Sequence, residues 1–222
     1  MNTGTGWRRA GLAVLLCSAG MLCAQARADD DISPNARLLA AVRAGDTAGV
    51  SATLQQGAAV DTRNRIGDTP LLSASKRGLT EMARTLLEHG ANVNQANVQG
   101  VTPLMAAAFG GHEEIVAMLL ARHAELAATD RVDKTAMVYA AGQGHAGVVR
   151  QLLEAGVDVN TTYGNGLTAL MWAAGYDQAD AVRLLLAKGA RPELRDNRGK
   201  TARDIAEQAG AANVLGLLGT PR

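Results

Sequence analysis

The sequence predicts an all-α repeat solenoid, a stack of similar helical units in place of one globular core. Threonine recurs with a spacing of 33 residues, at Thr69, Thr102, Thr135, Thr168 and Thr201. Glycine recurs in two series in the same register, at Gly45, Gly78, Gly111, Gly144 and Gly210 and at Gly57, Gly90, Gly156 and Gly189. Hydrophobic residues make up 47% of the chain but aromatic residues only 3%, which is typical of thin layers of Ala, Leu and Val. One such unit cannot bury its apolar face, whereas stacked copies can, so the period indicates a solenoid.

Each unit is predicted to contain two short helices. In the second unit, the Thr69 hydroxyl caps the first helix by accepting a backbone N–H bond, and Pro70 occupies the first helical position. That helix ends at Gly78, which can adopt the left-handed conformation. The second helix covers residues 81–88, has one apolar face and ends at Gly90. The stretch rich in Asn and Gly that follows predicts a turn or hairpin leading into the next unit.

The recurring threonine is interpreted as part of the scaffold and not as a catalytic group. A catalytic hydroxyl is needed once, whereas this threonine occupies the same structural position in five units. A capping role explains the repetition, because every first helix begins with backbone N–H groups that need an acceptor.

The pattern resembles the ankyrin repeat, which has a 33-residue period. Residues 67–94 carry the landmarks of that family as G-D-T-P-L-L-S-A-S-K-R-G, followed further on by L-L-E-H-G-A-N-V-N. The resemblance covers about residues 31–218 and implies six stacked repeats in a curved array, with more polar capping repeats at the two ends. We predict an ankyrin repeat domain at 29–222, with units one to six at 31–63, 64–96, 97–129, 130–162, 163–195 and 196–219.

The chain departs from the family pattern at two kinds of position. Apolar residues replace the motif histidine at Leu72, Met105, Val138 and Met171. The hydrogen bonds at the helix start are therefore expected to be made by other groups. Asp133 stands in place of a turn glycine, and Asp is among the few other residues that tolerate a positive φ.

Residues 1–28 form a predicted secretory signal peptide. Two arginines at residues 8 and 9 precede an apolar run at 11–24, and Ala26 and Ala28 supply the small side chains that a signal peptidase reads. We therefore expect cleavage after Ala28 and a periplasmic or secreted protein. The alternative is an uncleaved N-terminal anchor, although the apolar run is short for a membrane span.

Removal of the signal peptide changes the charge and the cysteine content. Residues 1–28 hold three of the 22 basic residues, no acidic residue and both cysteines, so the formal net charge falls from +1 to −2 and no thiol is left. This balance argues against a nucleic-acid partner, which usually binds a strong basic excess. Without disulfides the mature chain is stabilised by packing alone. We expect a monomer with no membrane insertion.

No motif for catalysis or for binding a cofactor or metal is found. The glycines are spaced for turns and not clustered as in a phosphate loop, and no G-x-S-x-G nucleophile elbow occurs. His112 and His145 occupy equivalent positions in neighbouring units, about 8–10 Å apart, whereas zinc ligands lie about 2 Å from one ion. The sequence therefore predicts structural histidines, no catalytic, cofactor or metal site, and no enzyme.

The resemblance implies that a partner protein is held along the hairpin tips and the concave face formed by the first helices. The partner-binding candidates on this line are Arg65, Ile66, Lys76, Arg77, Phe109, Arg131, Lys134, Tyr139, Trp172 and Tyr176. Asp68 is also expected at the surface there. Trp, Tyr and Arg are favoured at the centre of interfaces. For Tyr139 and Trp172 the alternative is that their rings fill the core between units, because large rings are commonly buried.

These features favour a non-enzymatic scaffold for protein–protein interaction, similar to small exported bacterial ankyrin proteins. Roles that the resemblance implies are assistance or protection of an exported enzyme and neutralisation of a toxin as an immunity protein. The alternative is a structural envelope component that associates with itself. Concentration-dependent oligomers would distinguish this alternative from a monomeric scaffold.

Overall fold

A computed structural model of the chain describes residues 33–219, and the predicted signal peptide lies outside this range. Six helix pairs follow one another within it. The first helices of the pairs are α2 (Pro34–Ala44), α4 (Pro70–Arg77), α6 (Pro103–Gly110), α8 (Ala136–Gln143), α10 (Ala169–Gly175) and α12 (Ala202–Ala209). The second helices are α3 (Thr47–Gln55), α5 (Thr80–Glu88), α7 (Glu113–Leu120), α9 (Ala146–Glu154), α11 (Ala179–Ala187) and α13 (Ala212–Leu215).

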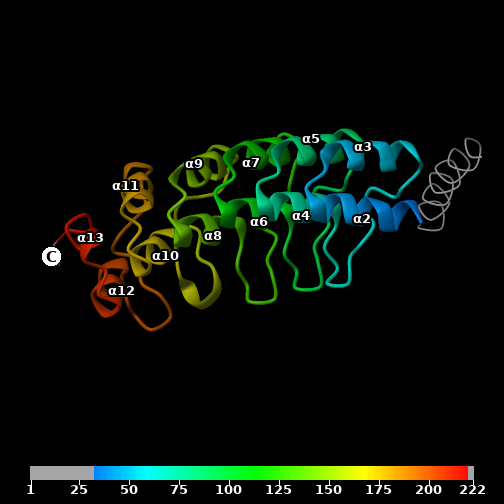
Figure 1. Cartoon of the computed structure of the whole chain (residues 1–222). Helices are drawn as coiled ribbons and strands as arrows, with labels where there is room; N and C mark the ends of the chain where they lie inside the picture. Colours follow the sequence, from blue (N-terminus) through cyan, green and yellow to red (C-terminus); the bar gives the residue numbers. More distant parts are fainter. Residues whose placement is uncertain (1–32, 220–222) are drawn as a thin grey trace, which may run out of the picture.

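The helices form two layers along an elongated array (Figure 1). In one layer the first helices lie side by side, so that α4 packs against α2 and α6, and the order continues to α12. The second helices form the other layer, and the loops between units project away from it. Each unit contacts its neighbours in sequence, as in other repeat proteins. The predicted all-α repeat solenoid is confirmed.

The core is a continuous band between the two layers. In units two to five, the second helix has a leucine at the same position of the repeat. These leucines are Leu86, Leu119, Leu152 and Leu185, each with 0% exposure. The first helices contribute many alanines, whose small side chains let neighbouring helices approach closely. Within residues 33–219, no helix has both the length and the hydrophobicity that a bilayer span requires.

The recurring threonine caps the first helix in all five units that contain it, as predicted. Its Oγ1 accepts a hydrogen bond from the backbone N–H three residues on, over 3.2–3.4 Å. In four units that N–H belongs to the apolar residue that replaces the family histidine, and the side chains of these residues are buried at Leu72, Met105, Val138 and Met171. The threonine hydroxyl thus makes the hydrogen bond at the start of the helix, while the residue three positions on contributes its apolar side chain to the core.

A second periodic feature closes the hairpins between units. The side-chain Oδ1 accepts N–H bonds from the residues two and four positions on, over 2.9–3.0 Å, at Asn64, Asn97, Asp130 and Asp196. Unit five departs from this pattern, because Tyr163 occupies the same register. Its hairpin keeps the backbone bond of the other units, from the Tyr163 N–H to the Leu167 carbonyl, and contains a 3-10 turn at Gly164–Gly166.

Gly90→Ala is expected to lower the free energy of unfolding by about 1 kcal/mol or more. Gly90 follows α5 at a φ of 81°, in the left-handed region that disfavours a side chain. No neighbouring atom lies within 4 Å of the position that its Cβ would take, so backbone strain is the expected cause. Urea denaturation monitored by circular dichroism measures the change.

Gly216→Ala is the matched control for this substitution. Gly216 follows α13 at a φ of −66°, which suits any residue, and its added Cβ also meets nothing within 4 Å. Alanine is therefore expected to be neutral or slightly stabilising there. Equal effects of the two substitutions would contradict the conformational role given to Gly90.

Candidate protein-binding surface

The exposed large apolar side chains of residues 33–219 lie on one face. They are Ile66, Val98, Phe109, Val132 and Tyr176, and each of these residues is 51–66% exposed. All five belong to hairpin tips or to the C-terminal ends of first helices, and none belongs to a second helix. We term the surface formed by these tips and first helices the first-helix face. Exposed apolar side chains grouped in this way are typical of interaction sites.

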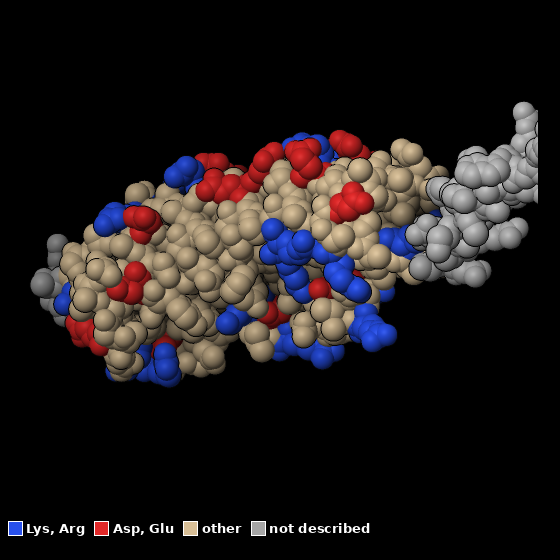
Figure 2. All heavy atoms as spheres, viewed as in Figure 1, with Lys and Arg blue, Asp and Glu red and all other residues tan. Residues whose placement is uncertain are grey.

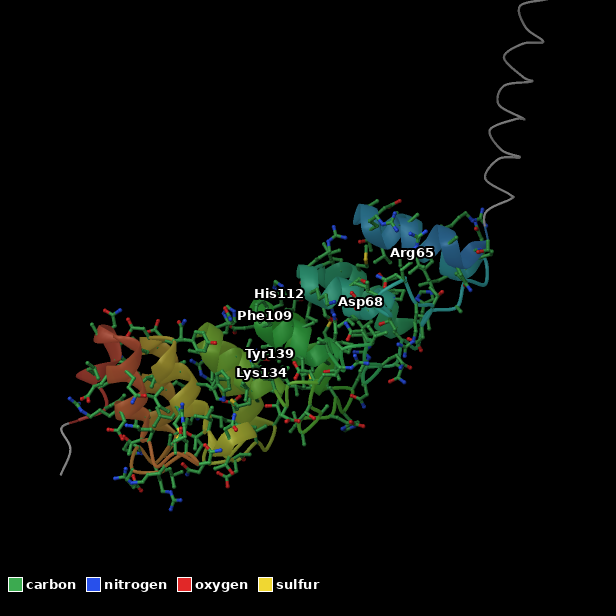
Figure 3. The ribbon with its side chains drawn as sticks, turned by 90° about the horizontal axis from the view of Figure 1, so that it is seen from below. Arg65, Asp68, Phe109, His112, Lys134 and Tyr139 are labelled. Carbon is green, nitrogen blue, oxygen red and sulfur yellow. The ribbon has the colours of Figure 1, made fainter. Side chains whose placement is uncertain are left out.

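Four aromatic rings and one lysine gather at the middle of the first-helix face. Phe109 of α6 meets Tyr139 of α8 edge-on, with ring centroids 5.7 Å apart. Trp172 stacks on Tyr176 at the end of α10, with centroids 6.1 Å apart. The Lys134 Nζ lies 5.6 Å from the Tyr139 centroid and 5.0 Å from that of Trp172, within cation–π range of both. We term these five residues the aromatic cluster; Figure 3 shows three of them side by side.

Two small hollows flank the stacked pair of the aromatic cluster. One of about 50 Å³ lies among the five cluster residues and is completed by Val138, Gly142 and Gln143. The other, of about 170 Å³, lies on the far side of Trp172 and Tyr176 and reaches Ile205 and Arg198. Both are smaller than typical pockets for organic ligands. Their volumes are of the order of a single side chain.

A buried carboxylate fixes the position of Tyr139. The Tyr139 hydroxyl donates a hydrogen bond to Oδ2 of Asp130. Burial, together with this bond, raises the pKa of Tyr139 above its ordinary value, so the phenol stays neutral. Burial alone would raise the pKa of Asp130, but the hydrogen bonds from Tyr139 and from the N–H groups of Lys134 and Val132 lower it. Asp130 therefore stays ionised and holds both its own hairpin and the ring.

Tyr139 and Trp172 each have one side in the core and one at the surface. Both side chains are half-buried, and both pack against the apolar core. Both also line the smaller hollow. The core-filling alternative therefore describes one side of each ring, while the other side faces the surface.

Asp68 forms a polar link between units two and three, with Lys76 of its own unit and Asn97 of the next as partners. The Lys76 Nζ lies 2.6 Å from Oδ2 of Asp68, and the Asn97 amide donates to Oδ1 of Asp68 over 2.8 Å. Asp68 is only 4% exposed, so the expectation that it lies at the surface is wrong. Its two partners compensate the burial of the carboxylate, which explains how a charged residue is tolerated there.

The remaining basic candidates lie apart from the aromatic cluster. The Arg77 guanidinium donates to the carbonyl groups of Val42 and Arg43 at the end of α2, over 2.7 and 3.1 Å, and thereby caps that helix. Arg65 and Arg131 are exposed at hairpin tips, as is Ile66. The ten candidates thus divide into the five residues of the cluster, three tip residues and two cations that already have partners.

Charge is unevenly distributed over the molecule. Figure 2 shows Asp and Glu gathered along the edge formed by α5 and α7, where Glu81, Glu113 and Glu114 begin the two helices. Lys and Arg gather below them, over α4 and the first hairpins. The N-terminal part of the first-helix face is therefore basic, which favours an acidic partner surface.

The sequence reasoning did not single out Gly142, although it shapes the aromatic cluster. The Tyr176 ring lies 3.7 Å from the position that a Cβ of Gly142 would take. The absence of a side chain in α8 therefore leaves space beside that ring. The sequence offers one indication, a glycine inside a predicted helix. Glycine lowers helix stability relative to alanine, so its presence suggests that another group lies close to the backbone at that position.

The two glycine-preceded histidines serve as contacts between units. The His145 Nε2 lies 2.9 Å from the Phe109 carbonyl oxygen. A Cβ at Gly78 would come within 2.5 Å of the His112 ring, so the ring packs directly over that glycine. No group of three or more His, Cys, Asp or Glu in the described part of the chain is placed to hold a metal ion.

The fold and the surface together define a helical repeat protein with one open, partly apolar face. A family model described as ankyrin repeats (3 copies) matches residues 38–130 and again residues 136–219. The chain therefore belongs to the ankyrin repeat family, as the sequence pattern predicts. A search of curated proteins gave no match. Ankyrin repeats generally serve as modules for protein–protein interaction.

Proposed function

We propose that the protein is a non-enzymatic scaffold that binds a partner protein through the first-helix face, which the family resemblance implies is the concave side. The observation that carries this proposal is the position of the exposed large apolar side chains, all of which in residues 33–219 lie on that face. Two of them, Phe109 and Tyr176, belong to the aromatic cluster. Interface hot spots are enriched in such rings near the centre of the contact.

The aromatic cluster suits a partner segment that carries an apolar side chain beside a carboxylate. The hollows of about 50 and 170 Å³ on the two sides of the Trp172–Tyr176 pair would receive side chains. Lys134 forms no ion pair within residues 33–219, and its ammonium is held beside two rings. A partner carboxylate would meet a cation that is already positioned, which reduces the entropy lost on binding.

The signal peptide predicted at 1–28 supports a site of action outside the cytoplasm. The partner would then be another exported protein. It would be either an enzyme that the scaffold assists or protects, or a toxin that it neutralises as an immunity protein. Both roles use the same surface, and the identity of the captured protein distinguishes them.

Affinity capture tests this function directly. The purified chain, immobilised, is exposed to an extract of exported proteins, and the retained protein is identified by mass spectrometry and titrated in purified form. We expect saturable binding by one protein. Light scattering on the chain alone tests the self-associating alternative, and concentration-dependent oligomers without a captured partner would favour it.

We expect the exported protein to begin after Ala28. The small residues Ala26 and Ala28 follow the apolar run at the spacing that signal peptidase reads. Intact-mass measurement of the protein recovered from the periplasmic or secreted fraction checks this. Ala26→Leu combined with Ala28→Leu serves as the control and is expected to leave the segment attached. A mass that retains residues 1–28 in the unaltered protein would contradict the prediction.

A further inference from the structure

A cleft of about 670 Å³ opens between the loops of units four and five. Its walls come from residues 126–135, at the junction of units three and four, and from residues 156–164, at the junction of units four and five, and it shares no lining residue with the aromatic cluster. Most of the lining is apolar, with Leu126 and Val157 among the contributing residues. This volume lies within the usual range for pockets that hold small molecules.

The cleft lies beside the one hairpin, among those that begin at residues 64, 97, 130, 163 and 196, that lacks the side-chain closure by Asn or Asp. Backbone bonds of 3.0 Å join the hairpins of units three and four, from Arg131 N–H to Gln99, and those of units five and six, from Asn197 N–H to Asn165. In the described part of the chain, no backbone hydrogen bond joins the hairpins of units four and five, or those of units two and three. Of these two junctions, the one between units four and five also lacks the side-chain closure, because Tyr163 replaces the Asn or Asp of the other hairpins.

Uncompensated negative charge lies at the cleft. Asp133 and Asp158 are among its lining residues, and the lining contains no Lys or Arg. Neither carboxylate forms an ion pair within residues 33–219. Asp133 and Thr135 line the cleft, while the intervening Lys134 belongs to the aromatic cluster. The local charge therefore favours a cation.

Besides the apolar lining and the two carboxylates, the cleft contains the Tyr163 ring. Burial, and then the nearby charge of Asp158, raises the pKa of Tyr163 to about 12. The phenol is therefore neutral at physiological pH and adds no charge of its own. A neutral ring attracts a cation placed over its face.

We propose that this cleft binds a small organic cation with an apolar body, such as a hydrophobic primary amine. The apolar lining would receive the body of the molecule. Asp133 and Asp158 would attract the ammonium group, and the Tyr163 ring would add a cation–π contact. This site shares no lining residue with the aromatic cluster, so its test does not depend on the proposed protein partner.

Calorimetric titration with three small molecules of similar skeleton tests the charge requirement. The probes are phenethylammonium, the neutral phenethyl alcohol and the anionic phenylpropanoate. We expect saturable binding of the ammonium, at least about tenfold weaker binding of the alcohol and no detectable binding of the anion. Equal affinity for the alcohol, or no heat from the ammonium at concentrations of about 10 mM, would overturn the proposal.

Two variants and a control locate the binding. Asp133→Asn with Asp158→Asn is expected to weaken phenethylammonium binding by about tenfold or more, and Asn tolerates the φ of 58° at residue 133. Tyr163→Asn gives the hairpin the side chain of the other units and is expected to abolish binding while preserving the fold. The control Glu88→Gln removes an exposed carboxylate on α5 and should change nothing. Unchanged affinity in both cleft variants, or an equal loss in the control, would refute the site.

Discussion

Leu119→Ala is expected to lower the free energy of unfolding by roughly 2–5 kcal/mol. Leu119 is fully buried in α7, near the middle of the array. Helix α7 packs against α5 on one side and α9 on the other, so a cavity at this position removes contacts at two interfaces between units. Because each repeat is stabilised by its neighbours, the loss would weaken the array at its centre.

The volume-conserving substitution Leu119→Met separates cavity formation from other effects. Methionine fills a similar volume, so the expected cost is below about 1.5 kcal/mol. Urea denaturation of the two variants and the unaltered chain measures the difference. A change of less than about 1 kcal/mol for Leu119→Ala would show that the register assigned to α7 is wrong, because a fully buried leucine cannot be truncated at so small a cost.

The fold follows from the sequence because its determinants are local and repeated. Thr69 and its equivalents begin a first helix through a bond to a residue only three positions away. Gly78 ends such a helix at a φ of 67°, and Asp133 adopts a φ of 58° in a turn, both as predicted. These features depend on neighbours in the chain, so a single sequence contains enough information to place them.

The errors and omissions concern contacts between units. A charged residue such as Asp68 is expected to be exposed, yet Lys76 and an amide from the next unit compensate its burial. Tyr163 visibly breaks a periodic series of Asn and Asp, but the cleft beside it depends on how two hairpins separate in space. The residues of the aromatic cluster were predicted as partner-binding candidates, whereas their pairing and the position of Lys134 required the structure.

The double variant Phe109→Ala, Tyr176→Ala is expected to lose the partner while its Tm stays within a few degrees of the unaltered chain. Phe109 and Tyr176 are 52% and 55% exposed, so their truncation leaves no large internal cavity. Each ring packs on a half-buried ring, Tyr139 or Trp172, which stays in place and limits the loss of stability. Removing two rings from the centre of an interface typically lowers affinity by several kcal/mol.

Capture of the partner and thermal unfolding together decide between a surface and a core role for these two rings. The control is Glu88→Ala with Arg150→Ala, which alters two exposed residues of second helices and should leave capture and Tm unchanged. Unchanged capture by the aromatic variant would exclude the cluster as the binding site, and a Tm lowered by more than about 10 °C would assign the rings to the core. Loss of capture in the control but not in the aromatic variant would assign the site to the second helices, because no residue of the first-helix face is changed in the control.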